Sequence, residues 1–223
     1  MFPSDSTLFY TLVHTFFRIL LILMMRLRIE GREHLPRSGS CILACNHTFG
    51  HDYFTLGVAT PRKIVFMVKV EALNYHPFIT WMLRTGGVVP VHRGVADVDA
   101  LKTAVGLVKS GRMLGMFPEG TRSPNGVLQS GKPGTALIAL DAKAPIVPAV
   151  VIGSEAGWKN APRFWKRPEV IVRFGPPFML EGDSSRSRPA VVAGTKRIMT
   201  EIAALLPPDQ RGEWGGGTVN GGQ

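Results

Sequence analysis

The chain has 223 residues, of which 45% are hydrophobic, so it is long enough to form one sizeable domain or one domain with an appendage. Lysine and arginine total 26 against 16 acidic residues, and most of the resulting formal net charge of +10 lies beyond residue 60 and not in a basic tail. This balance suits a phosphate-bearing ligand, an anionic lipid or a nucleic acid, and it also fits a protein that is merely soluble and basic.

The most apolar stretch comes first, as LFYTLVHTFFRILLILMM at residues 8–25. It lacks the preceding positive charge and the following small-residue cleavage site of a secretory signal. Its length is at the lower limit for crossing a bilayer. Polar residues recur at intervals of three and four, as on one stripe of a helix: Thr7, Thr11, His14, Thr15 and Arg18. We predict an amphipathic helix that lies in one leaflet or packs its polar stripe on the domain, with a transmembrane span as the alternative.

Short apolar runs then alternate with helical or Gly/Pro-rich pieces. We expect strands near 41–46, 64–68, 88–91, 112–117, 146–152 and 169–174. We expect helices near 52–60, 75–84, 97–110, 134–142 and 189–206. This alternation predicts an α/β fold with a mixed or mostly parallel sheet flanked by helices. The expected organisation is an N-terminal helix in residues 1–27, one domain in 28–206 and a disordered tail in 207–223.

The two cysteines, Cys41 and Cys45, lie in the first expected strand. Their Cα atoms would be about 13 Å apart in a strand, whereas a disulfide needs less than about 7 Å. We therefore expect two small buried thiols in a reducing compartment.

A basic and aromatic stretch, GWKNAPRFWKRPEV, occupies residues 157–170. Amphipathic rings beside cations suit a membrane interface. Stacking on single-stranded nucleic acid and an ordinary basic loop are the alternatives.

The first candidate site is NHTFGHD, residues 46–52, which follows the expected strand at 41–46. Asp52 falls near the first turn of the next helix, close enough to fold back on His47 and fix its tautomer for a role as a base. A structural histidine at a strand end is the alternative. A metal site is a weaker interpretation. His47 and His51 are four residues apart, but Thr48 stands where a zinc protease has its glutamate, and no cluster of cysteines and histidines supplies further ligands.

Two further groups of polar residues follow strand ends. FPEGTRS, residues 117–123, brings a carboxylate, a glycine, a hydroxyl and a guanidinium into one loop, and a tight turn with a Glu–Arg pair is the alternative interpretation. VVPVHR ends in Arg93 after another strand. Arginine binds phosphate through two parallel hydrogen bonds. In an α/β sheet, these groups are expected to meet at one edge.

Together these motifs resemble those of the glycerolipid acyltransferases, in particular the 1-acylglycerol-3-phosphate acyltransferases, over about residues 28–180. NHTFGHD resembles the family's N-H-x(4)-D motif, and FPEGTRS matches the family motif at every position. VVPVHR is similar to its arginine-ending motif, and IVPAVVIG to its fourth, proline-bearing strand. Phe49 and Pro90 depart from the usual pattern, and both positions bear on the choice of substrate.

The resemblance implies direct transfer of a fatty acyl group from a thioester, acyl-CoA or acyl-carrier protein, to the free hydroxyl of a lysophospholipid. His47 would be the general base and Asp52 would orient it. Arg93 and Arg122 would hold the acceptor phosphate with help from Lys69. The remaining substrate-binding residues would position the glycerol or the loop that carries the base: Asn46, Glu119, Gly120 and Thr121.

The resemblance also implies partners and a location. No metal and no cofactor is expected, because the acyl thioester is a co-substrate. The lipid acceptor implies contact with a membrane surface, at the cytoplasmic face of the cell membrane. A lyso-aminolipid acceptor and a non-catalytic lipid-binding protein are the alternatives. Nucleic acid is not an expected partner, since neither a helix-turn-helix nor a zinc-finger pattern is evident.

Overall fold

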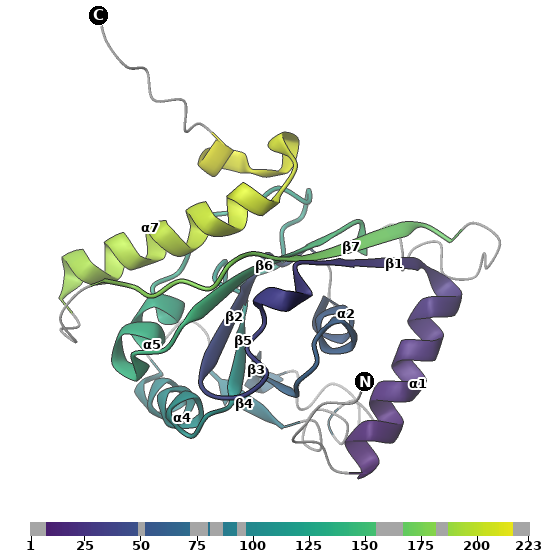
Figure 1. Ribbon diagram of the computed structural model, residues 1–223. Coiled ribbons are helices and arrows are strands. Elements are labelled where there is room, and N and C mark those ends of the chain that lie inside the picture. Colours follow the sequence, from purple (N-terminus) through teal and green to yellow (C-terminus); the bar gives the residue numbers. More distant parts are fainter. Residues whose placement is uncertain are drawn as a thin grey trace, which may run out of the picture.

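A seven-stranded sheet forms the centre of the computed structural model (Figure 1). The structure describes residues 8–48, 52–71, 80, 87–92, 97–154, 167–181 and 187–215. The strands lie in the order β1-β7-β6-β2-β5-β3-β4, and every neighbouring pair is parallel except β6 and β7. Their bounds are β1 Arg26–Glu30, β2 Cys41–Cys45, β3 Ile64–Lys69, β4 Val88–Val91, β5 Met113–Met116, β6 Ile146–Ile152 and β7 Glu169–Phe174. The prediction of a mostly parallel sheet is confirmed.

Helices cover both faces of this sheet. They are α1 Leu8–Met24, α2 Asp52–Ala59, α4 Val98–Lys109, α5 Gly134–Ala142 and α7 Arg188–Leu205, with short 3-10 turns η1 Arg32–His34, η3 Pro208–Gln210 and η4 Gly212–Gly215. Helices α4, α5 and α7 pack on one face, and α1 and α2 on the other (Figure 1). The helix expected at 75–84 lies outside the described residues except for Thr80.

Strand β2 shows why the sequence of a central strand is a continuous run of apolar residues. All five of its residues are buried. Ile42 packs in the core beneath α4, α5 and α7, whereas Cys41, Leu43 and Cys45 pack in the core beneath α1 and α2. A parallel strand covered on both faces needs apolar side chains on both. Both cysteines are free, and burial raises the pKa of the Cys41 thiol to about 12, so the prediction of unpaired buried thiols is confirmed.

Helix α1 packs against α2 through a short row of side chains. His14 is buried, with its Nε2 atom 3.2 Å from the carbonyl oxygen of Gly57, and burial lowers the pKa of its imidazole. Phe17 stacks on Phe54 of α2 with ring centroids 4.2 Å apart. Residues 8–24 therefore form a helix that docks on α2. None of the helices in the described part of the chain is long and apolar enough to cross a membrane.

The expectation of a disordered tail from residue 207 is wrong for residues 207–215. Backbone N–H of Leu128 donates to the carbonyl of Gln210 at 2.8 Å, and the indole N–H of Trp214 donates to the carbonyl of Gln129 at 3.1 Å. Glycine and proline made this segment resemble a tail, but Trp214 packs against the core and supplies the apolar contact that orders it. Residues 216–223 lie outside the described part.

Candidate active site

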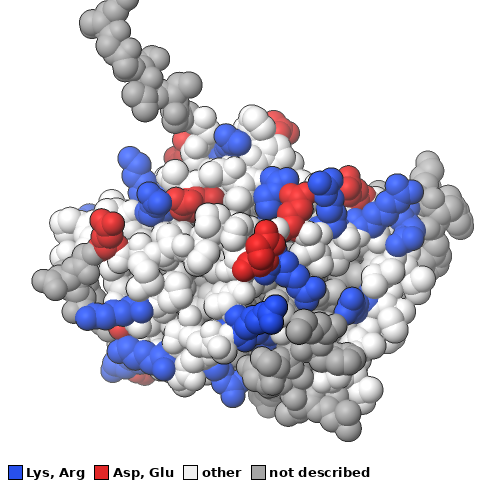
Figure 2. Space-filling view, in the orientation of Figure 1, with Lys and Arg blue, Asp and Glu red and all other residues white. Residues whose placement is uncertain are grey.

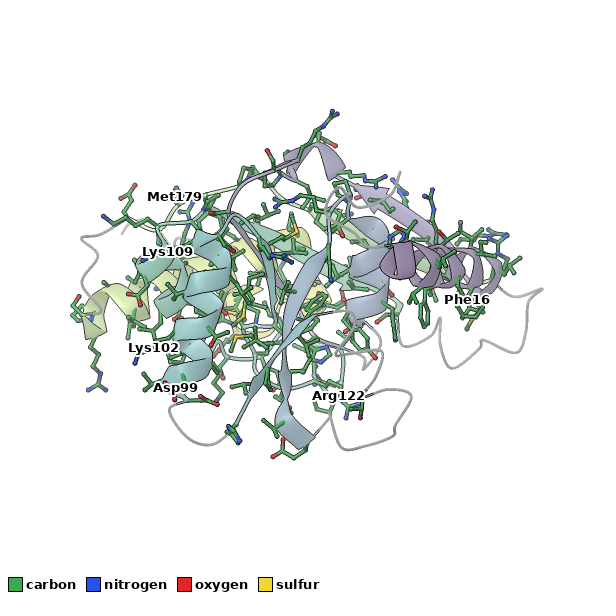
Figure 3. The ribbon with its side chains drawn as sticks, turned by 90° about the horizontal axis from the view of Figure 1, so that it is seen from below. Phe16, Asp99, Lys102, Lys109, Arg122 and Met179 are labelled. Carbon is green, nitrogen blue, oxygen red and sulfur yellow. The ribbon has the colours of Figure 1, made fainter. Side chains whose placement is uncertain are left out.

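The carboxyl ends of four neighbouring strands meet at one edge of the sheet. Strands β2, β5, β3 and β4 are adjacent and mutually parallel. The loops after β2 and β5 carry His47 and Arg122, so these two motifs meet at one edge as predicted. Figure 3 shows Arg122 among the loops beside the strand ends, away from Lys102 and Lys109 on the flanking helix α4.

His47 and Asp52 form a hydrogen-bonded pair at this edge. Nδ1 of His47 lies 3.0 Å from Oδ2 of Asp52, and the same oxygen accepts the backbone N–H of Thr48 at 2.9 Å. Asp52 begins helix α2 and is fully buried, whereas the His47 side chain is 13% exposed. A carboxylate that accepts from Nδ1 leaves Nε2, on the opposite side of the ring, able to take a proton. The predicted folding back of Asp52 on His47 is present in the structure.

Asn46 holds the loop that carries His47. Its Oδ1 accepts the backbone N–H of Val151 at 2.8 Å, and its Nδ2 donates to the carbonyl of Val151 at 3.2 Å. The neighbouring Thr48 hydroxyl lies 3.1 Å from the hydroxyl of the buried Ser154, so the loop is fixed to the end of β6 twice. Because its amide is buried and engaged with β6, Asn46 fixes the loop, and a direct contact with the substrate stays a prediction. Its expected role in fixing the loop agrees with these bonds.

The carboxylate of Glu119 binds backbone N–H groups of two loops and does not face solvent. Its Oε1 accepts the backbone N–H of His47 at 2.7 Å, and its Oε2 accepts the backbone N–H of Gln129 at 3.0 Å. The side chain is buried, and burial raises the pKa of its carboxyl. Glu119 therefore holds the loop through two backbone N–H groups, and its expected contact with the glycerol stays a prediction.

The loop after β5 also contacts His47 from the other side. Backbone N–H of Ser123 donates to the carbonyl of His47 at 2.7 Å. Gly120 has a φ of 69°, a left-handed conformation that favours glycine, and its N–H donates to the carbonyl of Phe117 at 2.9 Å. The FPEGTRS loop therefore folds as a tight turn whose geometry fixes His47 through both of its backbone groups.

The remaining predicted substrate-binding residues lie only partly within the residues that the structure describes. Thr121 and Arg122 are exposed in the turn after β5, and Lys69 is exposed at the end of β3. Because β3 is two strands from β2, Lys69 lies about 10 Å from the end of β2 along the sheet. Arg93 lies outside the described residues.

Phe117 and Gln129 are the residues of this site that sequence reasoning missed. Phe117 stacks on the His47 ring with centroids 4.1 Å apart and an angle of 19° between the planes. Gln129 contributes through its backbone N–H, which carries no sequence signal. Phe117 did carry one, since it is an aromatic residue at the end of a strand beside a candidate catalytic loop.

Among the residues that the structure describes, no group of three or more His, Cys, Asp or Glu side chains could hold a metal ion. His51, the possible second ligand, lies outside those residues.

The mostly parallel α/β sheet, with the His47–Asp52 pair and the FPEGTRS turn at its carboxyl edge, agrees with the expected class of acyl-transferring enzymes. The family described as Acyltransferase matches residues 26–152, more than half of the chain. The chain belongs to this acyltransferase family and is an acyltransferase enzyme.

Three similar proteins bear related names. A 1-acyl-sn-glycerol-3-phosphate acyltransferase of Bacillus subtilis is 34% identical over 141 residues, which are 63% of this chain and 69% of that protein. A chloroplastic enzyme of the same name from Brassica napus is 36% identical over 129 residues, 56% of this chain and 37% of that protein. The crystal structure of the 1-acyl-sn-glycerophosphate acyltransferase PlsC from Thermotoga maritima has a TM-score of 0.63 at 26% identity and covers 87% of this chain and 81% of that chain.

Proposed function

We propose that this enzyme moves a fatty acyl group from an acyl thioester to the free hydroxyl of 1-acylglycerol-3-phosphate, giving phosphatidic acid. The donor is acyl-CoA or acyl-carrier protein. The names of similar proteins support the acceptor. The observation that carries the chemistry is the 3.0 Å contact between His47 Nδ1 and the buried Asp52 carboxylate.

The mechanism is direct transfer with His47 as general base. Nε2 takes the proton of the acceptor hydroxyl as its oxygen attacks the thioester carbonyl carbon. The carbon–sulfur bond then breaks, and the thiolate leaves and takes up the proton. Asp52 orients the imidazole and stabilises the imidazolium that forms. Base assistance is worth about 10²–10⁴-fold, and holding the two substrates together supplies much of the remainder.

An acceptor panel tests the reaction itself. The purified full chain is incubated with 1-acylglycerol-3-phosphate, glycerol-3-phosphate or a lyso-aminolipid, each with acyl-CoA or acyl-carrier protein, and the products are read by mass spectrometry. Phosphatidic acid from the first acceptor is expected as the main product. A preference for the lyso-aminolipid would show that the acceptor is that lipid and not 1-acylglycerol-3-phosphate. Binding of the lipids without turnover of any donor and acceptor pair would show that the protein is a non-catalytic lipid-binding protein.

Arg122 is proposed to bind the acceptor phosphate, together with Lys69 and Arg93. The support is its exposed position in the turn that holds His47. Losing a charge-assisted hydrogen bond costs about 1.5–3 kcal/mol, so Arg122→Ala should lower kcat/KM for the lysophospholipid by about 10- to 100-fold. The change should be in the KM of the acceptor, with little change in the KM of the donor.

The matched control for this prediction is Arg112→Ala. Arg112 is also exposed, but it precedes β5 and so lies at the opposite edge of the sheet. Arg122→Lys should recover part of the loss, because an ammonium cannot reproduce the two-pronged contact. An unchanged acceptor KM together with a lowered melting temperature would mean that Arg122 supports the loop and does not touch the substrate.

Helix α1 is proposed to hold the enzyme on a membrane surface as a peripheral or monotopic protein at the cytoplasmic face. The support is an exposed apolar row on its outer side: Leu12, Phe16, Ile19, Ile22 and Leu23. Figure 3 shows Phe16 directed away from the sheet. Lys and Arg side chains lie beside α1 over β1 and β7 in Figure 2, with acidic side chains among them. The exposed Arg26 and Arg28 belong to β1, and Arg28 pairs with Glu30. Apolar side chains beside cations suit an anionic lipid surface.

Phe16→Asp tests the membrane surface. The Phe16 side chain is 63% exposed, so the folded domain should tolerate the change, whereas the burial of its ring in lipid, worth about 1.5–3 kcal/mol, is lost. Cosedimentation with vesicles of phosphatidylcholine and phosphatidylglycerol should weaken by about 10-fold or more. The control is Val192→Asp, at an equally exposed apolar position on α7. Equal binding by the two variants would contradict the proposed role of α1.

A further inference from the structure

The His47 ring is the first member of a stack of three rings. Phe117, at the end of β5, lies against one face of the imidazole, with centroids 4.1 Å apart and planes 19° apart. Phe66, from β3, lies nearly parallel to Phe117, with centroids 5.8 Å apart and planes 11° apart. The three rings come from three neighbouring strands of the sheet or the loops that follow them.

The stack rests on a glycine in the middle of a strand. Gly115 of β5 is the sheet neighbour of Phe66, and a Cβ atom built on Gly115 would lie 2.4 Å from Cε1 of the Phe66 ring. It would also lie 2.6 Å from Cγ2 of Ile64. Glycine in a strand interior costs stability, and here the missing side chain is the space in which the Phe66 ring lies.

A hydrogen bond alone does not fix an imidazole plane. The bond from Nδ1 to Asp52 holds one edge of the His47 ring, but the ring can still tilt about that contact. A flat ring against its face removes the tilt and aims Nε2 in one direction. The face of an aromatic ring is also electron-rich and attracts a cation placed over it.

We propose that Phe117 is a positioning residue for this reaction, supported from behind by Phe66 and Gly115. It fixes the plane of His47 while the ring is neutral and stabilises the imidazolium once the proton has moved from the acceptor hydroxyl. This inference rests on the proposed role of His47 as general base.

Phe117→Leu removes the ring and keeps an apolar side chain. Its kcat is expected to fall about tenfold, which corresponds to about 1.4 kcal/mol of transition-state free energy. The KM values of donor and acceptor should change little, because Phe117 acts through His47. The matched control is Phe178→Leu, which removes a half-buried ring on the opposite face of the sheet, where it packs with α7. The control should lower the melting temperature and leave kcat unchanged.

A series of fluorinated phenylalanines at position 117 separates charge from shape. Fluorine withdraws electron density from the ring face and changes the ring outline only slightly. If the face stabilises the imidazolium, kcat should fall stepwise from one to three to five fluorines while the melting temperature stays constant. A flat series would overturn this stabilisation, because packing alone does not depend on the charge of the ring face.

A double-mutant cycle tests the support from the glycine. Gly115→Ala should displace the Phe66 ring and lower kcat, and Phe66→Leu should lower kcat by removing the same support. Because the two positions act in one chain of contacts, the double variant should lose less than the product of the single losses. Independent, multiplicative losses would contradict the supporting role of Gly115.

His47→Ala, measured in the same assay, distinguishes a failure of the role proposed for Phe117 from a failure of the role proposed for His47. An inactive His47→Ala protein with a fully active Phe117→Leu protein would overturn the role of Phe117 and leave the base in place. An active His47→Ala protein would show that His47 is not the general base, and the ring stack would then have no catalytic role.

Discussion

Asp52→Asn is expected to lower kcat by about two orders of magnitude or more, with the fold intact. The asparagine side chain has the same shape but fails in either orientation. With its nitrogen toward His47, the histidine proton must sit on Nε2, which can then no longer accept a proton from the substrate. With its oxygen toward His47 the tautomer is kept, but the negative charge that stabilises the imidazolium is lost.

The chain offers a matched control for this substitution. His92 and Asp97 have the same spacing as His47 and Asp52, and Nδ1 of His92 also lies 3.0 Å from Oδ2 of Asp97. Asp97 caps α4 by accepting the N–H of Ala100, and its backbone bonds hold the pKa of its carboxyl to about 2. Asp97→Asn should lower the melting temperature and leave kcat near the wild-type value. Equal loss of kcat in both variants would mean that neither pair is specifically catalytic.

These two pairs show what spacing alone can predict. A histidine followed five residues later by an aspartate at a helix start folds into the same hydrogen bond twice in this chain. Burial distinguishes them, since the side chains of His47 and Asp52 are 13% and 0% exposed, compared with 68% and 14% for His92 and Asp97. Burial depends on the neighbouring strands and loops, so it required the structure.

Most strands could be predicted because the apolar pattern that specifies each one lies within its own short run of residues. Runs such as CILAC and IVPAVVI carry apolar residues on both faces, as a buried parallel strand must. Strand β1 was missed because RLRIE is short and directly follows an apolar helix, although its alternation of arginine with Leu27 and Ile29 is typical of a half-buried edge strand.

The roles of the polar residues were harder to predict, because their partners are far away in the sequence. Asn46 bonds to Val151 and Glu119 bonds to His47, across separations of 105 and 72 residues. From sequence alone, a polar residue beside a catalytic motif is assigned to the substrate. In the structure these two side chains bond to the backbone, because a buried polar group must be hydrogen-bonded.

His47→Ala removes the proposed base entirely. The alanine retains the backbone N–H and carbonyl that bond to Glu119 and Ser123, so the loop contacts that depend on the main chain remain. We expect a folded protein whose kcat for phosphatidic acid formation is about 10²–10⁴-fold lower than that of wild type. His51→Ala is the control, because it removes a histidine four residues further along the same motif and should have a mild effect.

The most direct test of the account is therefore kcat for phosphatidic acid formation from 1-acylglycerol-3-phosphate and an acyl thioester by His47→Ala, read by mass spectrometry at saturating substrates beside wild type and His51→Ala. We expect a loss of at least about 100-fold in His47→Ala alone, with an unchanged circular dichroism spectrum. A well-folded His47→Ala protein that turns over at a near-normal rate would contradict it. A loss confined to His51→Ala would show that the base is the other histidine.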